Sequence, residues 1–400
     1  MHITYIVYTK KGRKIMGLGF SLEDLFDMSQ VEEGDEPVFF SKTGNLNLSA
    51  SNMLHRGKAY KYGDTGVAYS EDGKTLLSCP AMRPGTVRIH EGVETIGDYA
   101  FYKGALSAVV LPDSLTRIER SAFAESDLTQ ITFGKGLTSI GDDNDTERVF
   151  SNCKCLASVV IPDNITALDN YSFSECSNLT KAVLPATMTK IGSGVFWGCI
   201  LENTVIPKSV KTVGSRAFAG ARSLIFEDIP KKLIAAIASE EDDSRCDFIF
   251  INEGEKNYTK VTYNNTTLFI PKFIKSKFFK ELVDNFDKTW FSSPKGHTLF
   301  LEGSSLNIQT DTAFAEYQSR QTPEAFSFMN KNGKAMAERY LLKKRQDEFV
   351  DLLKTGAIDR RLLPELLDIA NKNEKTIAAA YIMQCMGNAP DDVYDDTYDL

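Results

Sequence analysis

Two short segments of the chain contain residue types that bind phosphate or calcium in other proteins. The segment SEDGKT ends in Gly73, Lys74 and Thr75, as a phosphate-binding loop does, but Ala68 stands where that loop needs its first glycine. We therefore interpret SEDGKT as a hairpin turn. The segment DDNDTE at residues 142–147 resembles the start of a calcium loop, yet it lacks the glycine and the glutamate that complete one. We interpret it as an acidic solvated loop, with a binding role as the alternative.

The cysteines and histidines form no pattern typical of a metal site or a catalytic nucleophile. Cys153, Cys176 and Cys199 follow one another at equal spacing, which predicts a ladder of small buried residues. Cys153 and Cys155 have no second cysteine pair at zinc spacing, and the four histidines form no HExxH motif. We therefore predict no metal site, no cofactor and no enzymatic activity. A hydrolase within residues 231–400 is the alternative that a polar pocket with perturbed pKa values would favour.

Composition and charge limit the class of protein further. The 400 residues are 42% apolar and 25% charged, which is typical of a folded chain, and the net charge of −8 disfavours binding to nucleic acid. Seven cysteines are too few and too scattered for a disulfide framework. No run of 18 apolar residues occurs, so we expect no membrane insertion. The first apolar run precedes its positive charges, which indicates a hairpin at Ile3–Thr9 and Lys14–Gly19 rather than a signal peptide.

One pattern recurs from Val87 onward and dominates the sequence. Each copy has an apolar strand, usually a proline, a second apolar residue that is usually followed by Gly, and then a phenylalanine, as in AVLPATMTKIGSGVF and TVIPKSVKTVGSRAF; Glu119 and Asp169 replace the Gly in two copies. The copies are 22 to 28 residues long, too short to bury an apolar face alone, so they must stack as a solenoid. We expect the phenylalanines to form the structural core: Phe101, Phe123, Phe150, Phe173, Phe196 and Phe218.

The repeat resembles the BspA-like leucine-rich repeat family. Leu106, Val109, Leu111 and Pro112 fit the pattern of that family, and Leu156, Val159, Ile161 and Pro162 fit it again one copy later. Gly134 stands where proline is usual, and one copy carries an insertion within DDNDTER. Residues 66–81 are similar to the hairpin that often precedes such arrays. The resemblance covers about residues 66–230, and Leu224, Ile229 and Pro230 resemble a truncated seventh copy.

The resulting fold class is α/β, with a leucine-rich-repeat solenoid of about six to seven coils. We predict an N-terminal α/β cap at residues 1–65, containing a short helix with Ser21 and Asp24 at capping spacing. The solenoid would follow at 66–230, an irregular α/β continuation at 231–310, a helical region at 311–388 and an acidic flexible tail at 389–400. In the helical region, one stripe is formed by Tyr340, Leu341, Phe349, Leu352 and Leu353, and a second by Leu362, Leu363, Leu366, Leu367 and Ala370. Gly356 would separate the two helices.

A partner-binding surface is expected on the outer side of the strands. The residue between the two inward strand residues of each copy forms one row, and the residues two positions earlier form a neighbouring row. The first row is Val110, Thr132, Val160, Val183 and Val205. The neighbouring row is Gln130, Ser158, Lys181 and Asn203. At about 4.8 Å per coil the first row spans roughly 20 Å. Packing of the helical region over this row is the alternative to exposure.

These observations predict a non-enzymatic protein-interaction module whose partner is another protein. The resemblance implies a bacterial surface protein, with adhesion or host-protein binding as the activity. The alternative is an intracellular scaffold whose helical C-terminal region docks a second partner. No signal peptide is visible in the sequence, which predicts a cytoplasmic protein unless a leader was removed, whereas the resemblance implies a cell-surface or secreted one.

Overall fold

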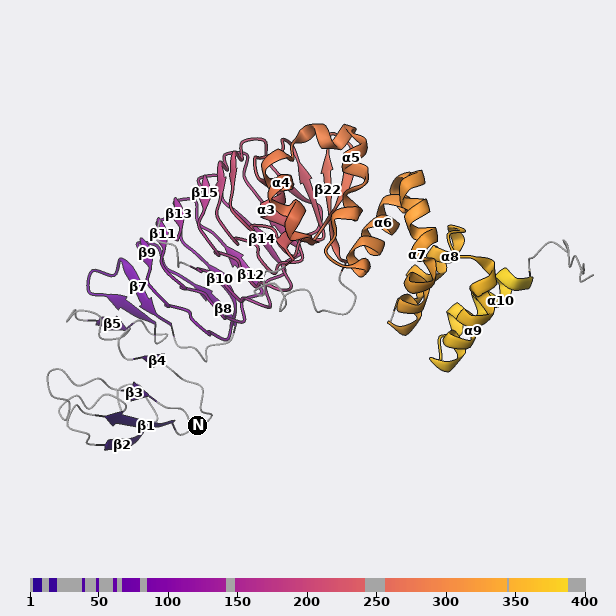
Figure 1. Cartoon of the computed structure of the whole chain (residues 1–400). Coiled ribbons are helices and arrows are strands. Elements are labelled where there is room, and N and C mark those ends of the chain that lie inside the picture. The colour runs from indigo at the N-terminus through magenta and orange to yellow at the C-terminus, as the bar shows by residue number, and fades with distance from the viewer. Residues whose placement is uncertain are drawn as a thin grey trace, which may run out of the picture. The chain divides into compact units, whose positions relative to one another are not determined.

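A computed structural model describes residues 67–79, 85–141, 148–241, 256–343 and 345–387, together with five short strands before residue 63. The chain divides into two compact units, Met1–Phe218 and Ala219–Leu400, which are described separately (Figure 1). The expected helix near Ser21, the segment DDNDTE and the acidic tail lie outside the described residues.

The first unit begins with short antiparallel pairs. β1 (Ile3–Tyr8) pairs with β2 (Lys14–Gly19), which confirms the expected hairpin, and β3 (Val38–Phe39) pairs with β4 (Leu48–Ser49). β5 (Tyr60–Tyr62), β6 (Ala68–Ser70) and β7 (Thr75–Ser78) form an antiparallel sheet.

The segment SEDGKT forms the turn between β6 and β7. Asp72 Oδ1 accepts hydrogen bonds from the Ser70 hydroxyl at 2.6 Å and from the Lys74 amide at 3.0 Å. Gly73 has a φ of +72°, which glycine adopts without strain. The segment is therefore a hairpin turn, as expected, and no phosphate-binding loop.

The repeats contribute two rows of parallel strands. In the long row, buried and outward-facing residues alternate along the strand; β14 and β16, for example, bury their central residue and turn the flanking residues outward, because successive side chains of a strand point to opposite faces. The long row consists of β8 (Gly85–Arg88), β10 (Leu106–Val110), β12 (Gln130–Thr132), β14 (Ser158–Val160), β16 (Lys181–Val183) and β18 (Thr204–Ile206). The short row consists of β9 (Thr95–Ile96), β11 (Arg117–Ile118), β13 (Ser139–Ile140), β15 (Ala167–Leu168), β17 (Lys190–Ile191) and β19 (Thr212–Val213).

A turn around the phenylalanine, here called the Phe turn, closes each coil. The amides of Tyr99, Phe101 and Lys103 donate hydrogen bonds to three carbonyl oxygens of the next coil at 2.6–3.0 Å. The residues two before and two after each phenylalanine have a positive φ, so every second amide faces the neighbouring coil. The Phe turns thus form a third ladder between coils besides the two rows of strands.

The core of the repeats is a column of stacked phenylalanine rings. All six repeat phenylalanines are at most 1% exposed. Neighbouring ring centroids lie 4.7–6.0 Å apart with interplanar angles of 5–14°. Beside this column, the thiols of Cys153, Cys176 and Cys199 are buried and donate to carbonyl oxygens of Phe123, Phe150 and Phe173, respectively, at 3.1 Å. The cysteines therefore form the ladder that their spacing predicted.

Close packing of the coils explains Gly134, which stands where most copies have proline. A Cβ atom at residue 134 would lie 1.8 Å from the carbonyl oxygen of Pro112 in the preceding coil. Any larger residue would have to push the two coils apart there.

The second unit opens with a small α/β region. β20 (Ser223–Phe226) is parallel to β22 (Tyr258–Tyr263), β22 is antiparallel to β23 (Thr266–Pro271), and β21 (Ser239–Glu240) is parallel to β24 (Phe273–Ile274). The helices of this region are α3 (Leu233–Ile237), α4 (Ser276–Asn285), α5 (Pro294–His297) and the 3₁₀ turns η3 (Lys288–Ser292) and η4 (Leu299–Glu302).

The described residues of the second unit from Leu306 onward are mainly helical. They form α6 (Leu306–Arg320), α7 (Pro323–Leu342), α8 (Gln346–Lys354), η5 (Arg360–Leu362), α9 (Leu363–Lys372) and α10 (Thr376–Gly387). Gly356, with a φ of +74°, follows α8 as expected, and Pro364 lies in the first turn of α9.

The prediction that Tyr340, Leu341, Phe349, Leu352 and Leu353 form one helical stripe is wrong. The first two belong to α7 and the other three to α8, because the backbone becomes extended at Lys343. Leu353 is partly buried and the other four side chains are fully buried, since the two helices fold onto one hydrophobic cluster.

Candidate functional site

The predicted partner-binding row lies along the strands of the long row. We call Val110, Thr132, Val160, Val183 and Val205 the valine strip. Val110 aligns with Thr132 in the register of β10 and β12, and Val160 aligns with Val183 in that of β14 and β16. Val160, Val183 and Val205 are 62%, 42% and 44% exposed, whereas Val110 is half-buried.

Exposure of three valines on neighbouring strands is unusual because the residues directly beside them in the strands are almost completely buried. Val159 and Ala182, between the outward residues of β14 and β16, are 2% and 4% exposed. The neighbouring row is polar and fully exposed; it contains Gln130, Ser158, Lys181 and Asn203. The strip is therefore apolar and uncharged, with a polar margin along one side.

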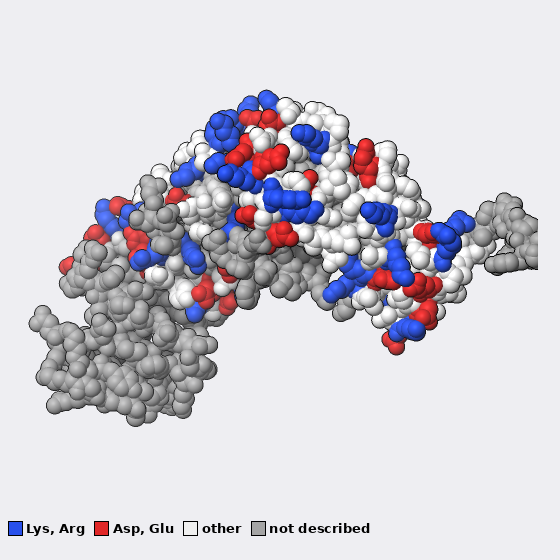
Figure 2. Space-filling model, in the orientation of Figure 1, with Lys and Arg blue, Asp and Glu red and all other residues white. Residues whose placement is uncertain are grey.

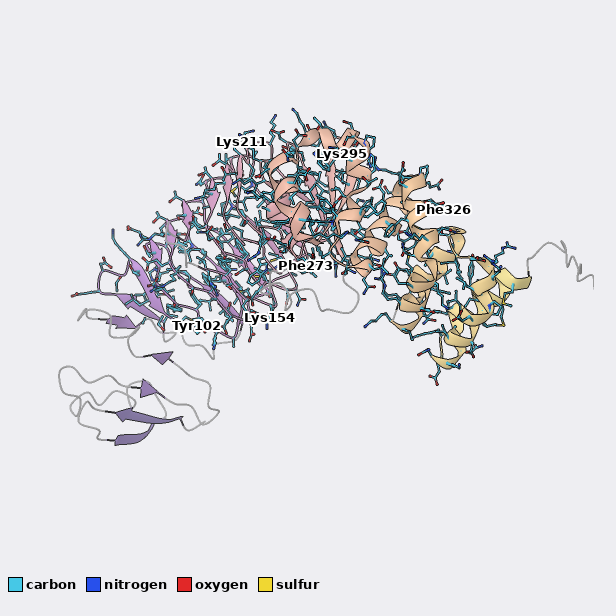
Figure 3. The ribbon with its side chains drawn as sticks, viewed as in Figure 1. Tyr102, Lys154, Lys211, Phe273, Lys295 and Phe326 are labelled. Carbon is cyan, nitrogen blue, oxygen red and sulfur yellow. The ribbon has the colours of Figure 1, made fainter. Side chains whose placement is uncertain are left out.

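A polar hollow lies on the Phe-turn side of the first four coils. It measures about 450 Å³, and it is lined by Tyr99, Tyr102, Arg120, Ser121, Ala124, Glu125, Arg148, Ser151, Asn152 and Glu175. Figure 3 labels Tyr102 at this edge of the repeat array, with Lys154 beside it and Lys211 at the opposite edge. We call this feature the Phe-turn hollow. None of its residues was predicted from the sequence as part of a site.

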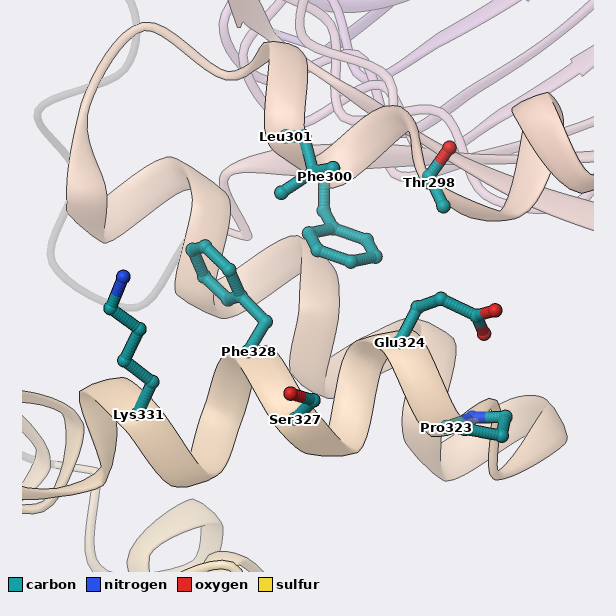
Figure 4. Close-up of a pocket in the computed structure, with 8 residues that line it drawn as sticks. All are labelled: Thr298, Phe300, Leu301, Pro323, Glu324, Ser327, Phe328 and Lys331. Atoms are coloured by element: carbon teal, nitrogen blue, oxygen red, sulfur yellow. The ribbon is translucent and has the colours of Figure 1, made fainter.

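The second unit has an apolar pocket of about 450 Å³ between η4 and the first turns of α7 (Figure 4). The rings of Phe300 and Phe328 both line it and contact each other, with centroids 5.2 Å apart and their planes tilted by 56°. Glu324 and Lys331 lie at its two ends, so its charges are at the margin and its interior is apolar.

A buried group of ionisable residues lies near this pocket but does not line it. Glu316 of α6 is 2% exposed, and burial raises the pKa of its carboxyl to about 7. His297 Nδ1 is 3.2 Å from Glu316 Oε1 without hydrogen-bond geometry, and burial followed by the charge of Arg320 lowers the pKa of His297. Because the perturbed groups and the pocket do not coincide, they do not form the convergent polar site that a hydrolase needs.

Cys176 is a buried thiol of the repeats and is not available as a nucleophile. Burial is the main cause that raises the pKa of Cys176 well above its ordinary value, so this thiol stays protonated. Among the described residues, no group of three or more His, Cys, Asp or Glu could hold a metal ion. In the same part of the chain, no helix is long and apolar enough to cross a membrane.

The surface charge is mixed in sign. Figure 2 shows Lys and Arg interspersed with Asp and Glu over the described residues, without a continuous basic patch on the visible face. Ion pairs of the repeats, such as Arg120 with Asp98 and Lys74 with Glu94, link consecutive coils.

The repeat geometry agrees with comparisons to known proteins. Residues 94–225 match the model of the BspA type leucine rich repeat region in six copies. This segment is therefore a BspA-type leucine-rich repeat region, as the sequence pattern predicted. The presence of such a repeat region supports the interpretation of the chain as a protein-interaction module, since stacked coils present an extended binding surface.

Solved structures similar to the chain are bacterial leucine-rich repeat proteins. One is a leucine-rich repeat protein from Eubacterium ventriosum, 25% identical with a TM-score of 0.33, covering 41% of this chain and 50% of that one. Another is a leucine rich cell surface protein from Faecalibacterium prausnitzii, 24% identical with a TM-score of 0.30, covering 43% and 54%. The leucine rich repeat protein of T. pallidum is 22% identical with a TM-score of 0.28, covering 42% and 82%. The chain thus spans about half the length of the first two. A search of curated proteins gave no match.

Proposed function

We propose that the chain is a non-enzymatic interaction protein whose valine strip binds an extended segment of a partner protein. The observation that carries this proposal is the exposure of Val160, Val183 and Val205 in consecutive coils, at 62%, 42% and 44%. Three outward valines on neighbouring strands form an apolar surface that water covers unfavourably.

The regular spacing of the strip defines the kind of partner that fits it. Parallel strands repeat about every 4.8 Å, so the strip offers equally spaced apolar contacts along one line. An extended polypeptide places side chains on one side about every 6.6 Å, so its apolar residues can contact the line of valines along its length without matching it residue for residue. The exposed margin of Gln130, Ser158, Lys181 and Asn203 would supply hydrogen bonds to the partner backbone.

The family resemblance of the repeats suggests that the partner is a host protein and that the contact serves adhesion. Under this proposal, fluorescently labelled full-length protein binds immobilised basement-membrane proteins, and the double variant Val160→Glu/Val183→Glu binds at least about tenfold more weakly. The reason is that two buried carboxylates at the contact would each lose solvation without gaining a partner.

A matched control places the same charges elsewhere on the same coils. Ser177 and Ala186 are exposed and lie outside the strip, so Ser177→Glu/Ala186→Glu should bind like the unmodified protein. Unchanged binding by a folded Val160→Glu/Val183→Glu variant would reject the strip as the contact surface.

A second candidate function, an intracellular scaffold, has its own observation in the helical part. α10 contains no charged residue, and Ile377, Met383 and Met386 on it are 60%, 54% and 40% exposed. An uncharged helix with exposed apolar residues suits docking of a second protein. Fractionation of the producing cells separates the two settings, because adhesion requires the protein at the cell surface and a scaffold requires it inside.

A further inference from the structure

The Phe turns of the first four coils hold side chains where glycine would be less strained. Among the described residues, positive φ angles of 37–61° occur two residues before or after the phenylalanines at Tyr99, Lys103, Ser121, Glu125, Arg148, Asn152, Tyr171, Glu175 and Arg216. The left-handed conformation costs a residue with a Cβ about 1–2 kcal/mol. The fifth coil avoids this cost with Gly194 and Gly198 at the same two positions. In coils one to four, residues with a Cβ therefore occupy positions at which glycine would give a more stable backbone.

These side chains converge on the Phe-turn hollow. Six of its ten lining residues have a positive φ, and they are Tyr99, Ser121, Glu125, Arg148, Asn152 and Glu175. A cavity of about 450 Å³ falls in the range of roughly 300–1,000 Å³ that is typical of sites for small molecules. The backbone strain and the cavity thus point to the same place on the repeats.

Three of the four charged side chains of the hollow, those of Arg120, Glu125 and Arg148, contact a neighbour of opposite charge or an aromatic ring. Arg120 Nη2 lies 3.0 Å from Asp98 Oδ2, and its guanidinium lies over the ring of Tyr99. The Tyr102 hydroxyl donates to Glu125 Oε1 at 2.8 Å. Two arginines and two glutamates line the hollow, so its formal charge is balanced.

Asn152 adds a hydrogen-bonding group without a partner. Its Oδ1 atom is shielded from water and accepts no hydrogen bond from the described residues. A buried acceptor without a donor costs about 1–3 kcal/mol. Rotation of the side-chain amide toward the hollow would let a ligand hydroxyl supply that donor.

We propose that the Phe-turn hollow binds a neutral saccharide. Guanidinium groups donate hydrogen bonds and carboxylates accept them, so neighbouring hydroxyls of a sugar can use both at once. The rings of Tyr99 and Tyr102 provide apolar surface for the C–H faces of a sugar ring. An apolar ligand would desolvate the arginines and glutamates without replacing their hydrogen bonds, and an ion of either sign would meet like charge in the hollow.

This site is separate from the valine strip, and the two can fail independently. The strip lies on the outward face of the long-row strands, whereas the hollow lies on the Phe turns. Saccharide binding would give the protein a second kind of contact, with a glycan, on a surface that the protein partner does not use.

The test uses the full chain and saturation-transfer difference NMR with maltose, lactose and N,N′-diacetylchitobiose as neutral probes. We expect at least one probe to receive saturation at millimolar concentration. The variants Glu175→Gly and Tyr99→Gly should each weaken this binding about tenfold, because they remove an acceptor and an apolar wall. Both variants place glycine at a positive φ of 60° or 57°, so neither should lower the thermal midpoint by backbone strain.

Lys154→Ala is the matched control, because Lys154 is exposed at the same edge and does not line the hollow (Figure 3). It should bind the probe like the unmodified protein. The proposal is overturned if none of the neutral probes receives saturation, if only the anionic probe 3′-sialyllactose does, or if both glycine variants bind as the unmodified protein does. Loss of binding in the strip variant Val160→Glu/Val183→Glu would also contradict the separation of the two sites.

Discussion

Each inner phenylalanine of the repeat column contacts the rings above and below it, so its burial depends on neighbouring coils as much as on its own. Phe173 lies between Phe150 at 5.0 Å and Phe196 at 5.7 Å, measured between ring centroids. Offset-parallel rings at such distances add to the free energy of burial. Removal of one ring therefore leaves a cavity and also deprives two other rings of a stacking partner.

Phe173→Ala should lower the free energy of unfolding by about 3–5 kcal/mol, because a fully buried aromatic side chain is replaced by a methyl group and a cavity. Urea denaturation followed by circular dichroism measures the change. Phe133→Ala is the comparison: this phenylalanine is half-buried and contacts the Phe150 ring edge-on, so the loss should be smaller. A loss below roughly 1 kcal/mol for Phe173→Ala would show that the stack does not carry the core.

Glu316 should make stability depend on pH in the direction opposite to most carboxyl groups. Its pKa of about 7 in the folded protein exceeds the ordinary 4.5, so the folded state binds an extra proton between these values. Stability from this group is present below about pH 4.5 and is lost as the pH rises toward 7 and above. The loss is about 1–3 kcal/mol.

The difference in unfolding free energy between the unmodified protein and Glu316→Gln isolates this contribution from the other carboxyl groups. Denaturation at several pH values between 4.5 and 8 should show the variant gaining stability relative to the unmodified protein as the pH rises. A difference that is independent of pH would mean that Glu316 titrates normally in the folded protein.

At the scale of the elements, the sequence predicted best the features in which one residue type recurs at constant spacing. The strands, the phenylalanine column and the cysteine ladder follow from residues at constant spacing. The left-handed positions of the Phe turn escaped detection because Tyr99, Arg148 and Glu175 share no residue type, and a positive φ is expected only at glycine. The hollow that they line was therefore invisible in the sequence.

The ends of the helices were predicted less well than the repeats, because they depend on contacts between residues that are distant in the sequence and form no recognisable motif. The break between α7 and α8 lies at Lys343–Arg345, where the sequence contains neither Gly nor Pro. The structure supplies a reason for the break: Arg345 turns its guanidinium to Asp311, and Nη1 lies 3.0 Å from both carboxylate oxygens. A residue 34 positions away thus helps to determine where the helices separate.

Asp311 joins four parts of the second unit and is 2% exposed. Besides Arg345, it accepts hydrogen bonds from Arg339, from the Tyr340 hydroxyl at 2.8 Å and from Asn257 Nδ2 at 2.6 Å. Asp311→Ala should lower the free energy of unfolding by about 3–5 kcal/mol, because two largely buried guanidinium groups lose their carboxylate.

The matched control for Asp311 is Asp368→Ala, which removes an exposed carboxylate paired with Lys372 at 2.6 Å on α9. Exposed pairs contribute about 0–1 kcal/mol, so this variant should unfold almost like the unmodified protein. Equal losses for the two variants would refute the role of burial at Asp311.

For the whole molecule, the two units rely on cores of different construction. The repeats have a one-dimensional column in which each coil contacts its neighbours, whereas the helices of the second unit share one cluster that includes Tyr340, Phe349 and Leu366. The stability of stacked repeats depends on the contacts between adjacent coils. A helical cluster with one shared core unfolds as a single cooperative unit.

We therefore expect two thermal transitions in differential scanning calorimetry of the full chain, each assigned by a variant already named. Phe173→Ala should lower the midpoint of one transition, and Asp311→Ala should lower the midpoint of the other, since each variant damages a single core. The magnitude should be about 2–4 °C for every kcal/mol lost in a unit of 150–250 residues. A single transition that both variants lower equally would show that the column and the helical cluster unfold together, and that the division at Phe218 has no thermodynamic counterpart.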